Sequence, residues 1–276
     1  MKRVNGIDHK VQGSKTPSDT LVLIHGLGAS SNQFADLLDF GDRGIRLLLV
    51  DLPGHARNIC REPERAAGFN TFSELIIDLC DRLDLRRSVF CGISMGSALS
   101  LKIAAKRPDL VRHVVAVRPA WMTSQKPVHL KLIGLIGELF ENHDAEDVLA
   151  RLEAVPSYRE LAADVSGSAA SVRGVVTRDN AREHAPVLTA IYGDRPFARL
   201  ADMRAVECPV DVLGTNADAL HPIALAHQTA NALPNARFGI LPPRYLEPAA
   251  HAAALKETLW KVMRQPHGDH RDYQKG

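Results

Sequence analysis

The chain has 276 residues, of which 45% are hydrophobic and 24% charged, and its formal net charge is only +2. This length can bury a substantial core in one or two domains, and the composition is ordinary for a globular protein. A nucleic-acid-binding protein is disfavoured because the sequence has no dense run of Lys and Arg.

The apolar runs and the cysteines bear on the cellular compartment. Residues 1–15 lack the apolar stretch of a secretory signal, and no run approaches the roughly 20 apolar residues that span a bilayer. Cys60, Cys80, Cys91 and Cys208 show no CxxC spacing, so we interpret them as reduced core thiols. We therefore expect a cytoplasmic protein that acts on a small molecule, with no membrane span and no nucleic-acid partner. The oligomeric state stays open, with a homodimer as one option.

Short apolar strands alternate with helices along most of the chain. The strands are predicted from continuous apolar runs, which are typical of strands covered on both faces. They cover residues 20–26, 46–54, 88–94, 111–119, 209–215 and 236–241. The predicted helices cover residues 71–83, with Thr71 as the N-cap, and residues 95–106, 221–233 and 248–263. This alternation predicts an α/β fold with a mostly parallel, doubly wound sheet.

One long segment interrupts the alternation. Residues 121–200 have helical character but contain no convincing strand, which predicts a helical cap inserted into the α/β core. The core then comprises residues 1–120 and 201–265, and the polar residues 266–276 are expected to form a disordered tail. The apolar stripe at residues 132–140 is short and weakly basic, which favours packing within the cap over contact with a membrane surface.

A candidate nucleophile lies between the predicted strand 88–94 and the predicted helix 95–106. The sequence Gly92-Ile93-Ser94-Met95-Gly96 is a G-x-S-x-G motif in the strand–turn–helix context that a nucleophile elbow requires. The turn is so tight that side chains two residues before and after the serine would collide, which accounts for both glycines. Ser94 is therefore presented at a helix N-terminus, where developing negative charge is favoured. The alternative is a glycine-rich turn without chemistry.

Four segments resemble the α/β-hydrolase superfamily in order and spacing, from about residue 20 to residue 263. They are His25-Gly26-Leu27-Gly28, Asp51-Leu52-Pro53-Gly54-His55, residues 92–96, and residues 214–222. The resemblance implies that the backbone N–H groups of Leu27 and Met95 form an oxyanion hole. It also implies a substrate pocket near His25, Gly26 and Trp121, although for His25 itself we expect mainly a bracing role in its loop.

Two features depart from the family pattern. Ala56 replaces the usual last glycine of the loop that begins at Asp51. The family also has two antiparallel strands before its His-Gly segment, whereas residues 4–13 offer only one good strand. We therefore expect the sheet to be trimmed at its N-terminal edge.

A nucleophilic serine needs a base and an acid that orients the base, in the family order Ser, Asp or Glu, His. Asp218 follows the predicted strand 209–215 and matches the family's acid loop; the alternative reading is a helix N-cap. The loop after the last strand, residues 242–247, contains no histidine. We expect His251, near the start of the final helix, to be the base, and keep His221 as the alternative.

These residues predict a cofactor-independent serine hydrolase. Ser94, His251 and Asp218 would cleave an ester, thioester, lactone or related carbonyl compound through an acyl-enzyme. A lyase or acyltransferase with the same serine, and a ligand-binding protein without activity, remain alternatives. The sequence offers no metal-ligand spacing and no Rossmann glycine motif, so neither a metal nor a nucleotide cofactor is expected. The apolar residues of the cap favour a moderately apolar substrate.

Overall fold

The computed structural model describes residues 2–17, 19–58 and 67–265. The expected tail at residues 266–276 and Cys60 lie outside these ranges. Cys80 and Cys91 are buried and Cys208 is half-buried, and all three are free thiols. They lie within the core, as interpreted from the sequence.

Within the described ranges, eight strands form a single sheet in the order β1-β2-β4-β3-β5-β6-β7-β8. The first two strands pair antiparallel with each other, β2 is antiparallel to β4, and all other neighbours are parallel. The strands are β1 (Lys2–Val4), β2 (Ile7–Gly13), β3 (Asp19–Ile24), β4 (Ile45–Asp51), β5 (Ser88–Ile93), β6 (Val111–Val117), β7 (Val210–Thr215) and β8 (Ala236–Leu241). The mostly parallel α/β sheet predicted from the sequence is confirmed.

The N-terminal edge corrects one expectation. Residues 2–13 form two antiparallel strands joined at Asn5 and Gly6, both of which have positive φ angles, so the sheet is not trimmed. Both strands carry many exposed or half-buried polar side chains, since β1 is the edge strand and β2 lies next to it. This composition hides them from a search for continuous apolar runs.

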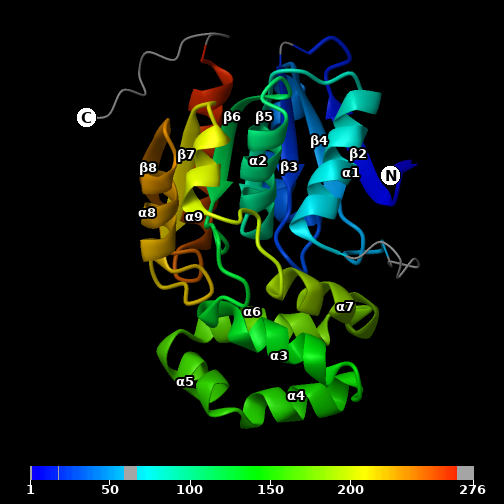
Figure 1. Ribbon diagram of the computed structural model, residues 1–276, viewed down its shortest axis with the longest axis vertical. Coiled ribbons are helices and arrows are strands. Elements are labelled where there is room, and N and C mark those ends of the chain that lie inside the picture. The colour runs from blue at the N-terminus through cyan, green and yellow to red at the C-terminus, as the bar shows by residue number, and fades with distance from the viewer. Residues whose placement is uncertain (1, 18, 59–66, 266–276) are drawn as a thin grey trace.

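Helices cover both faces of the sheet (Figure 1). One face packs against α1 (Phe69–Arg82), α2 (Met95–Lys106) and α8 (Ile223–Ala232), and their apolar side chains join one buried cluster. The other face packs against the irregular 3-10 segment η1 (Ser31–Arg43) and α9 (Pro248–Met263), which form a second cluster. Side chains alternate between the two clusters along each buried strand, as Val22 and Leu23 do in β3.

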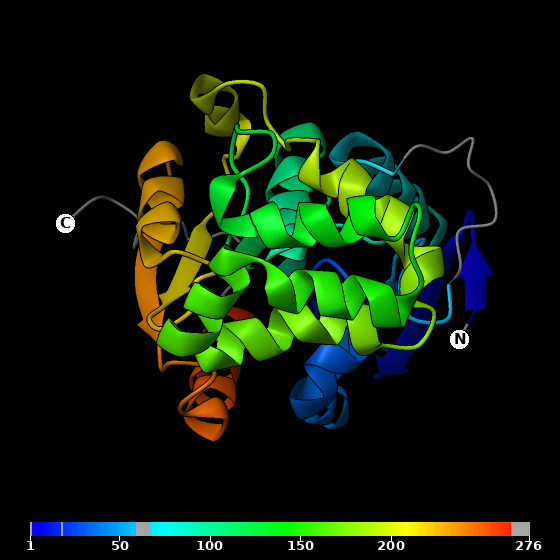
Figure 2. The ribbon, with the colours of Figure 1, turned by 90° about the horizontal axis from the view of Figure 1, so that it is seen from below.

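Helical residues between β6 and β7 lie below the edge where the parallel strands end (Figures 1 and 2). We call α3 to α7 the inserted helices. Their bounds are α3 (Lys131–Leu139), α4 (Ala145–Ala154), α5 (Pro156–Asp164), α6 (Ser166–Thr177) and α7 (Ala181–Tyr192), and the short 3-10 segments η2 (Val128–Leu130) and η3 (Leu200–Ala205) flank them. Two glycines of α3 let α7 approach closely: a Cβ at Gly134 would collide with the ring of Tyr192, and one at Gly137 with Thr189.

The first long helix, α1, is tied to the segment that follows the inserted helices. It begins at Phe69, two residues before the predicted N-cap Thr71. The carboxylate of Asp194 accepts a hydrogen bond from the backbone N–H of Phe69 at 2.8 Å. A capping group 125 residues away in sequence therefore sets this helix end.

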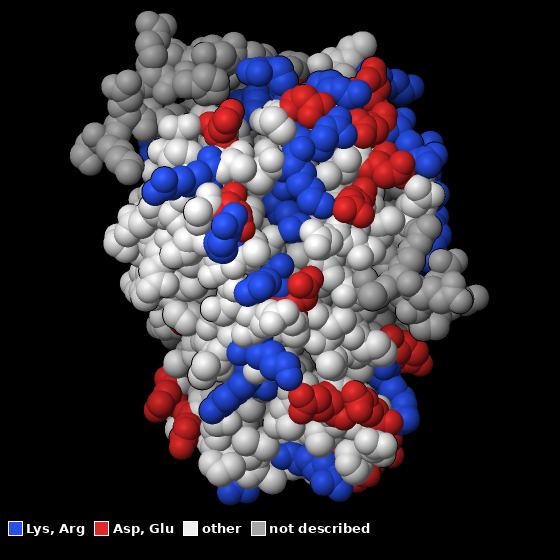
Figure 3. All heavy atoms as spheres, in the orientation of Figure 1, with Lys and Arg blue, Asp and Glu red and all other residues white. Residues whose placement is uncertain are grey.

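The surface in the view of Figure 3 carries basic and acidic side chains side by side over α1 and α2. Ion pairs that involve residues of α1 include Arg107 with Asp81 at 2.7 Å and Arg82 with Asp78 at 2.8 Å. Among the described residues, no helix combines the length and apolar character needed to cross a membrane.

Candidate active site

The turn between β5 and α2 presents Ser94 at the edge of the sheet that faces the inserted helices. Ser94 has φ 56° and ψ −110°, a strained conformation for a residue with a side chain. A Cβ at Gly92 would collide with the carbonyl oxygen of Gly96, and one at Gly96 with that of Ile24. The two glycines of the motif thus permit the tight turn, in the way argued from the sequence.

His221 contacts Ser94 directly. Its Nε2 lies 2.9 Å from Ser94 Oγ, and its Nδ1 lies 2.9 Å from Asp218 Oδ2. Asp218 and His221 belong to one turn after β7, closed by a backbone hydrogen bond from the His221 N–H to the Asp218 carbonyl at 3.2 Å. With the proton on Nδ1 donated to the carboxylate, Nε2 is free to accept the proton of Ser94.

A buried arginine completes the hydrogen bonding of Asp218. Arg118 follows β6 and donates from Nη1 to Asp218 Oδ2 at 2.9 Å, with both side chains almost fully buried. The other carboxylate oxygen accepts the backbone N–H of Leu220 at 3.2 Å. These donors fix the position of the carboxylate, because each is held by a strand end or by the turn itself.

The same contacts set the ionisation of the pair. Burial alone would raise the pKa of Asp218, but the adjacent His221 and Arg118 lower it well below its usual range. Burial lowers the pKa of His221, the charge of Asp218 opposes this, and the positive charges of Arg118 and Arg244 add to the lowering. The net result is an ionised carboxylate beside a neutral imidazole.

His251, the base preferred from the sequence, does not contact Ser94. It lies in the first turn of α9, and its Nδ1 is 2.8 Å from the carbonyl oxygen of Pro242. It lines a small neighbouring cavity together with Arg118 and Arg244. Geometry therefore favours the alternative base, His221, because the turn after β7 carries acid and base together.

The loop after β3 faces Ser94 from the opposite side. Gly26 is so close that a Cβ there would lie 3.4 Å from the Cβ of Ser94, and its N–H donates to Gln33 Oε1 at 2.9 Å. Leu27 lines the cavity beside Ser94, while Met95 is the first residue of α2, where helical N–H groups have no partner within the helix.

His25 is fully buried and holds this loop in place. Its Nε2 accepts the backbone N–H of Leu52 at 3.1 Å, and its Nδ1 lies 2.8 Å from the carbonyl oxygen of Gly26. It is not among the residues that line the cavity at Ser94, whereas Gly26 and Trp121 are.

A cavity of about 200 Å³ opens at Ser94 and His221. The loop after β3, the ends of β5 and β6, and the inserted helices α3 and α6 all contribute to its wall. Three arginines, Arg118, Arg178 and Arg244, line it alongside apolar residues such as Ile133 and Val175.

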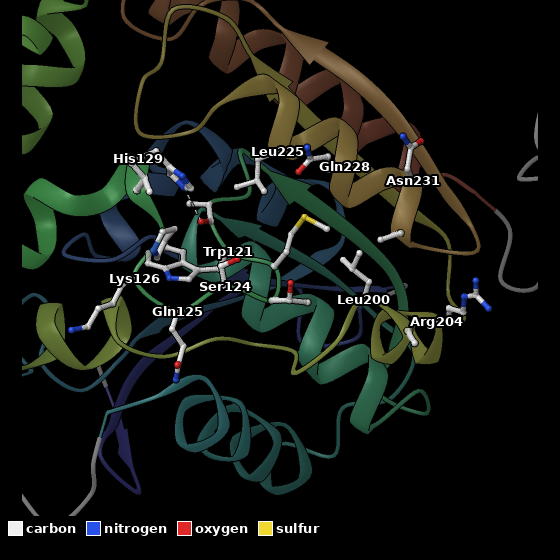
Figure 4. A pocket seen from close by; sticks show the side chains of 17 residues that line it. Trp121, Ser124, Gln125, Lys126, His129, Leu200, Arg204, Leu225, Gln228 and Asn231 are labelled. Carbon is white, nitrogen blue, oxygen red and sulfur yellow. Dashed lines mark hydrogen bonds between the residues drawn. The ribbon is translucent and has the colours of Figure 1, made fainter.

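A larger cavity of about 970 Å³ shares Trp121 with the cavity at Ser94. Figure 4 shows its wall, with Trp121 and His129 at one side and Arg204 and Asn231 at the other. The segment between β6 and η2 and the helix α8 supply most of this lining. Trp121 itself is buried and packs edge-on against Phe69, with ring centroids 5.6 Å apart.

Sequence reasoning missed the three arginines. Arg118 carried a signal, since it directly follows β6, at the alternative position of the family's acid. Arg178 ends α6 and Arg244 lies in the loop after β8; both are separated from Ser94 by many residues, and no local pattern distinguishes them. Within the described ranges, no three His, Cys, Asp or Glu side chains are grouped to hold a metal ion.

The sheet order and the serine turn define the class of protein. The sequence profile of the family described as "alpha/beta hydrolase fold" matches residues 19–244, and the chain belongs to this family. The resemblance drawn from the four segments is thereby confirmed. The protein is an enzyme of the hydrolase class on this fold.

Similar proteins span almost the whole chain. A protein named as a carbamate hydrolase, from Pseudomonas syringae, is 28% identical over 255 residues, covering 91% of this chain and 93% of its own. A pimeloyl-[acyl-carrier protein] methyl ester esterase of Nitrosomonas europaea is 26% identical and covers 80% and 86%. The solved structure of an enol-lactonase from Burkholderia xenovorans superimposes with a TM-score of 0.73 at 19% identity, covering 95% and 98%.

Proposed function

We propose that the protein is a cofactor-independent serine hydrolase in which Ser94 is the nucleophile, His221 the base and Asp218 the orienting acid. The observation that carries the proposal is the continuous chain of hydrogen bonds from Ser94 through His221 to Asp218, with both contacts at 2.9 Å. Such a chain joins a nucleophile, a base and an orienting carboxylate in the arrangement that nucleophilic catalysis requires.

Acylation begins when Ser94 Oγ attacks the carbonyl carbon of the substrate. The hydroxyl proton passes to His221 Nε2, and the C=O bond opens to an oxyanion next to the N–H groups of Leu27 and Met95. The oxyanion then collapses, the bond to the leaving group breaks, and His221 returns the proton to the departing alcohol. Asp218, ionised beside Arg118, stabilises the imidazolium during these steps.

Deacylation repeats the sequence with water. His221 takes a proton from the water molecule as its oxygen attacks the acyl carbon, and then returns it to Ser94 Oγ as the ester bond breaks. The acid product leaves and the serine is restored. Esters, thioesters and lactones all fit this machinery, and the names of the similar proteins include a methyl ester esterase and an enol-lactonase.

The first experiment compares hydrolysis of p-nitrophenyl acetate and butyrate by the wild type and three variants. We expect Ser94→Ala and His221→Ala each to lower kcat by on the order of 10³-fold or more, since both remove a member of the proposed triad. His251→Ala is the matched control, because it is a buried histidine at the same edge that does not contact Ser94. It should keep most of the wild-type activity.

Labelling with a fluorophosphonate probe tests the same assignment without a substrate. We expect the probe to modify Ser94 in the wild type and to fail with Ser94→Ala. Loss of activity in His251→Ala with an active His221→Ala would instead assign the base to His251. An inert wild type whose Ser94 resists the probe would contradict serine hydrolysis and leave a ligand-binding role. Product analysis with an added alcohol separates hydrolysis from acyl transfer.

A further inference from the structure

Three arginines stand around a small cavity that already contains the serine and the histidine. This inference rests on the proposed function and concerns the kind of substrate that the same site accepts. Arg118, Arg178 and Arg244 all line the cavity at Ser94. Among the described residues no Asp or Glu lines that cavity, so its wall is positively charged.

Arg178 is the clearest unpaired charge. It lies just after the last residue of α6, and the described residues offer it no ion pair. Its Nε donates a hydrogen bond to the carbonyl oxygen of Gly174 at 3.1 Å. Burial lowers the pKa of its guanidinium to about 10, with no opposing contribution from an acidic group. Arg178 is half-buried, and a partly desolvated cation without a paired counter-charge is unfavourable, which favours an anion at this position.

The guanidinium of Arg178 lies against the loop that faces Ser94. A Cβ at Gly28 would come within 2.5 Å of Arg178 Nη1, and Gly28 has a φ angle of 69°. Glycine at this position therefore makes room for the guanidinium beside the loop whose Gly26 contacts Ser94. Arg178 lines both the cavity at Ser94 and a neighbouring cavity of about 570 Å³ that Asp179 also lines. On the side of Ser94, where no carboxylate of the described residues competes, an anion held by Arg178 would lie beside the reacting carbonyl group.

Arg244 adds a second charge from the core side. It lies in the loop after β8, where its guanidinium carbon is 5.4 Å from the ring centroid of Tyr245. Its charge reaches the site, since it contributes to the lowered pKa of His221. Arg118, in contrast, already donates to Asp218, so its charge is largely committed.

We propose that the site accepts acyl substrates that carry a carboxylate close to the scissile carbonyl group, with Arg178 as its main binding residue and Arg244 as a supporting charge. Arginine suits this role because its planar guanidinium can donate two parallel hydrogen bonds to a carboxylate. The cavity volume of about 200 Å³ favours a small monoester of a dicarboxylic acid or a comparable lactone acid. This proposal replaces the moderately apolar substrate expected from the sequence.

The test compares a charged and a neutral ester. Methyl hydrogen glutarate carries the carboxylate, dimethyl glutarate is its neutral match, and p-nitrophenyl butyrate reports the triad alone. We expect the wild type to prefer methyl hydrogen glutarate over the dimethyl ester. In Arg178→Gln, the ratio of kcat/KM for the charged ester to kcat/KM for p-nitrophenyl butyrate should fall on the order of 10- to 100-fold, as for loss of a charged hydrogen bond.

Two variants serve as controls. Arg178→Lys keeps the charge but loses the fork of donors, so we expect it to recover only part of the preference for the charged ester. Arg173→Gln, on the same helix, removes an exposed arginine that pairs with Glu153, and it should behave as the wild type. Activity on p-nitrophenyl butyrate shows that each variant is folded.

Calorimetric titration of the Ser94→Ala protein with glutarate measures anion binding without any ester hydrolysis. Binding that is lost in Ser94→Ala/Arg178→Gln supports the proposal even where no ester is hydrolysed, in which case only the proposed hydrolase function fails. If p-nitrophenyl butyrate is hydrolysed but glutarate neither binds nor competes, the hydrolase stands and the carboxylate proposal is overturned. Equal rates for the charged and neutral glutarate esters would also overturn it.

Discussion

His221 stands between one negative and two positive side chains. Asp218 contacts its Nδ1, while the charges of Arg118 and Arg244 and burial keep its pKa below the ordinary value of about 6.5. A general base works in its neutral form, so a lowered pKa extends activity into mildly acidic solution. In the proposed site the arginines thus have two effects: they keep His221 neutral and they favour an anionic substrate.

The pH profile of kcat/KM on a neutral ester measures this effect. Activity depends on neutral His221 and is lost as pH falls through its pKa, so we expect the acid limb of the wild type to lie below pH 6.5. Arg244→Gln removes a positive charge that lowers this pKa, and the limb should move to higher pH by a fraction of a unit. Arg173→Gln should leave it in place; a limb unmoved by Arg244→Gln would contradict the coupling.

The sequence predicts which edge of the sheet carries the site, but it does not predict which of two histidines contacts Ser94. Strand–helix alternation predicts that Ser94, Asp218, His221 and His251 all lie at one edge of the sheet. Which imidazole faces Ser94 depends on side-chain direction. The turn that starts at Asp218 directs His221 to the serine, and the Pro242 carbonyl holds His251 elsewhere. Neither contact leaves a pattern in the sequence.

At the scale of elements, three adjacent strands end in a similar way. A residue other than glycine with positive φ follows each of β5, β6 and β7: Ser94 at 56°, Arg118 at 48° and Ala217 at 53°. Such backbone conformations are costly for residues with a side chain and persist where the surrounding structure enforces them. The three turns bring Ser94, Arg118 and Asp218 together at the centre of one sheet edge.

Two glycines within the inserted helices provide a matched pair for measuring helix packing. Gly134→Ala in α3 would push a methyl group into the ring of Tyr192 on α7, whereas Gly174→Ala in α6 meets nothing within 4 Å. We expect Gly134→Ala to lower the free energy of unfolding by about 1–3 kcal/mol, as overpacking does. Gly174→Ala should raise it by about 0.5–1 kcal/mol, because alanine favours the helix.

Denaturant unfolding followed by circular dichroism would measure both changes. Because Ile133, next to Gly134, lines the cavity at Ser94, a displaced α3 should also change KM in Gly134→Ala. Stabilisation of similar size in both variants would show that helix propensity, rather than the contact between α3 and α7, governs these positions.

Elements with a strong local pattern were predicted best. Helices 95–106 and 248–263 have the predicted bounds, because a tight turn and Pro248 define where they begin. The segment η1 was missed because it is built of short 3-10 turns with a kink at Phe34, although Phe34, Leu37 and Phe40 all join the second buried cluster. The start of α1 was displaced because Asp194 caps it from a distant part of the chain.

At the scale of the whole molecule, burial of histidines couples stability to pH. Burial is the largest cause of a lowered pKa at His9, His25, His55, His129, His184, His221 and His251. Below about pH 6.5 the unfolded chain therefore binds more protons than the folded protein, and acid favours unfolding. The lowered pKa of Asp218 acts in the same direction at more acidic pH.

Thermal unfolding at pH 8, 7, 6 and 5 would measure this coupling. We expect Tm to change little between pH 8 and 7 and to fall by several degrees between pH 7 and 5, as the unfolded histidines take up protons. A Tm that is constant or rises toward pH 5 would contradict the expected direction.

The global architecture was accessible from sequence, while the character of the cavity was not. Buried apolar runs and the four spaced segments were sufficient for the sheet and the family. The cavity wall combines Gly28, Arg118, Arg178 and Arg244, which come from four separate parts of the chain. The three arginine charges come together only after folding. The apolar residues of α3 therefore predict a more apolar pocket than the structure has.

The turn of residues 218–221 has a consequence for how such a chain can diverge. Because the carboxylate and the imidazole are carried by the same four residues, a single recombination junction anywhere between β6 and Asp218 would transfer both together. The loop after β8 then does not have to carry the catalytic histidine, so substitutions in this loop leave the proposed triad intact. Arg244 occupies that loop here, so drift at one position would retune substrate preference while the hydrogen-bonded pair is inherited intact.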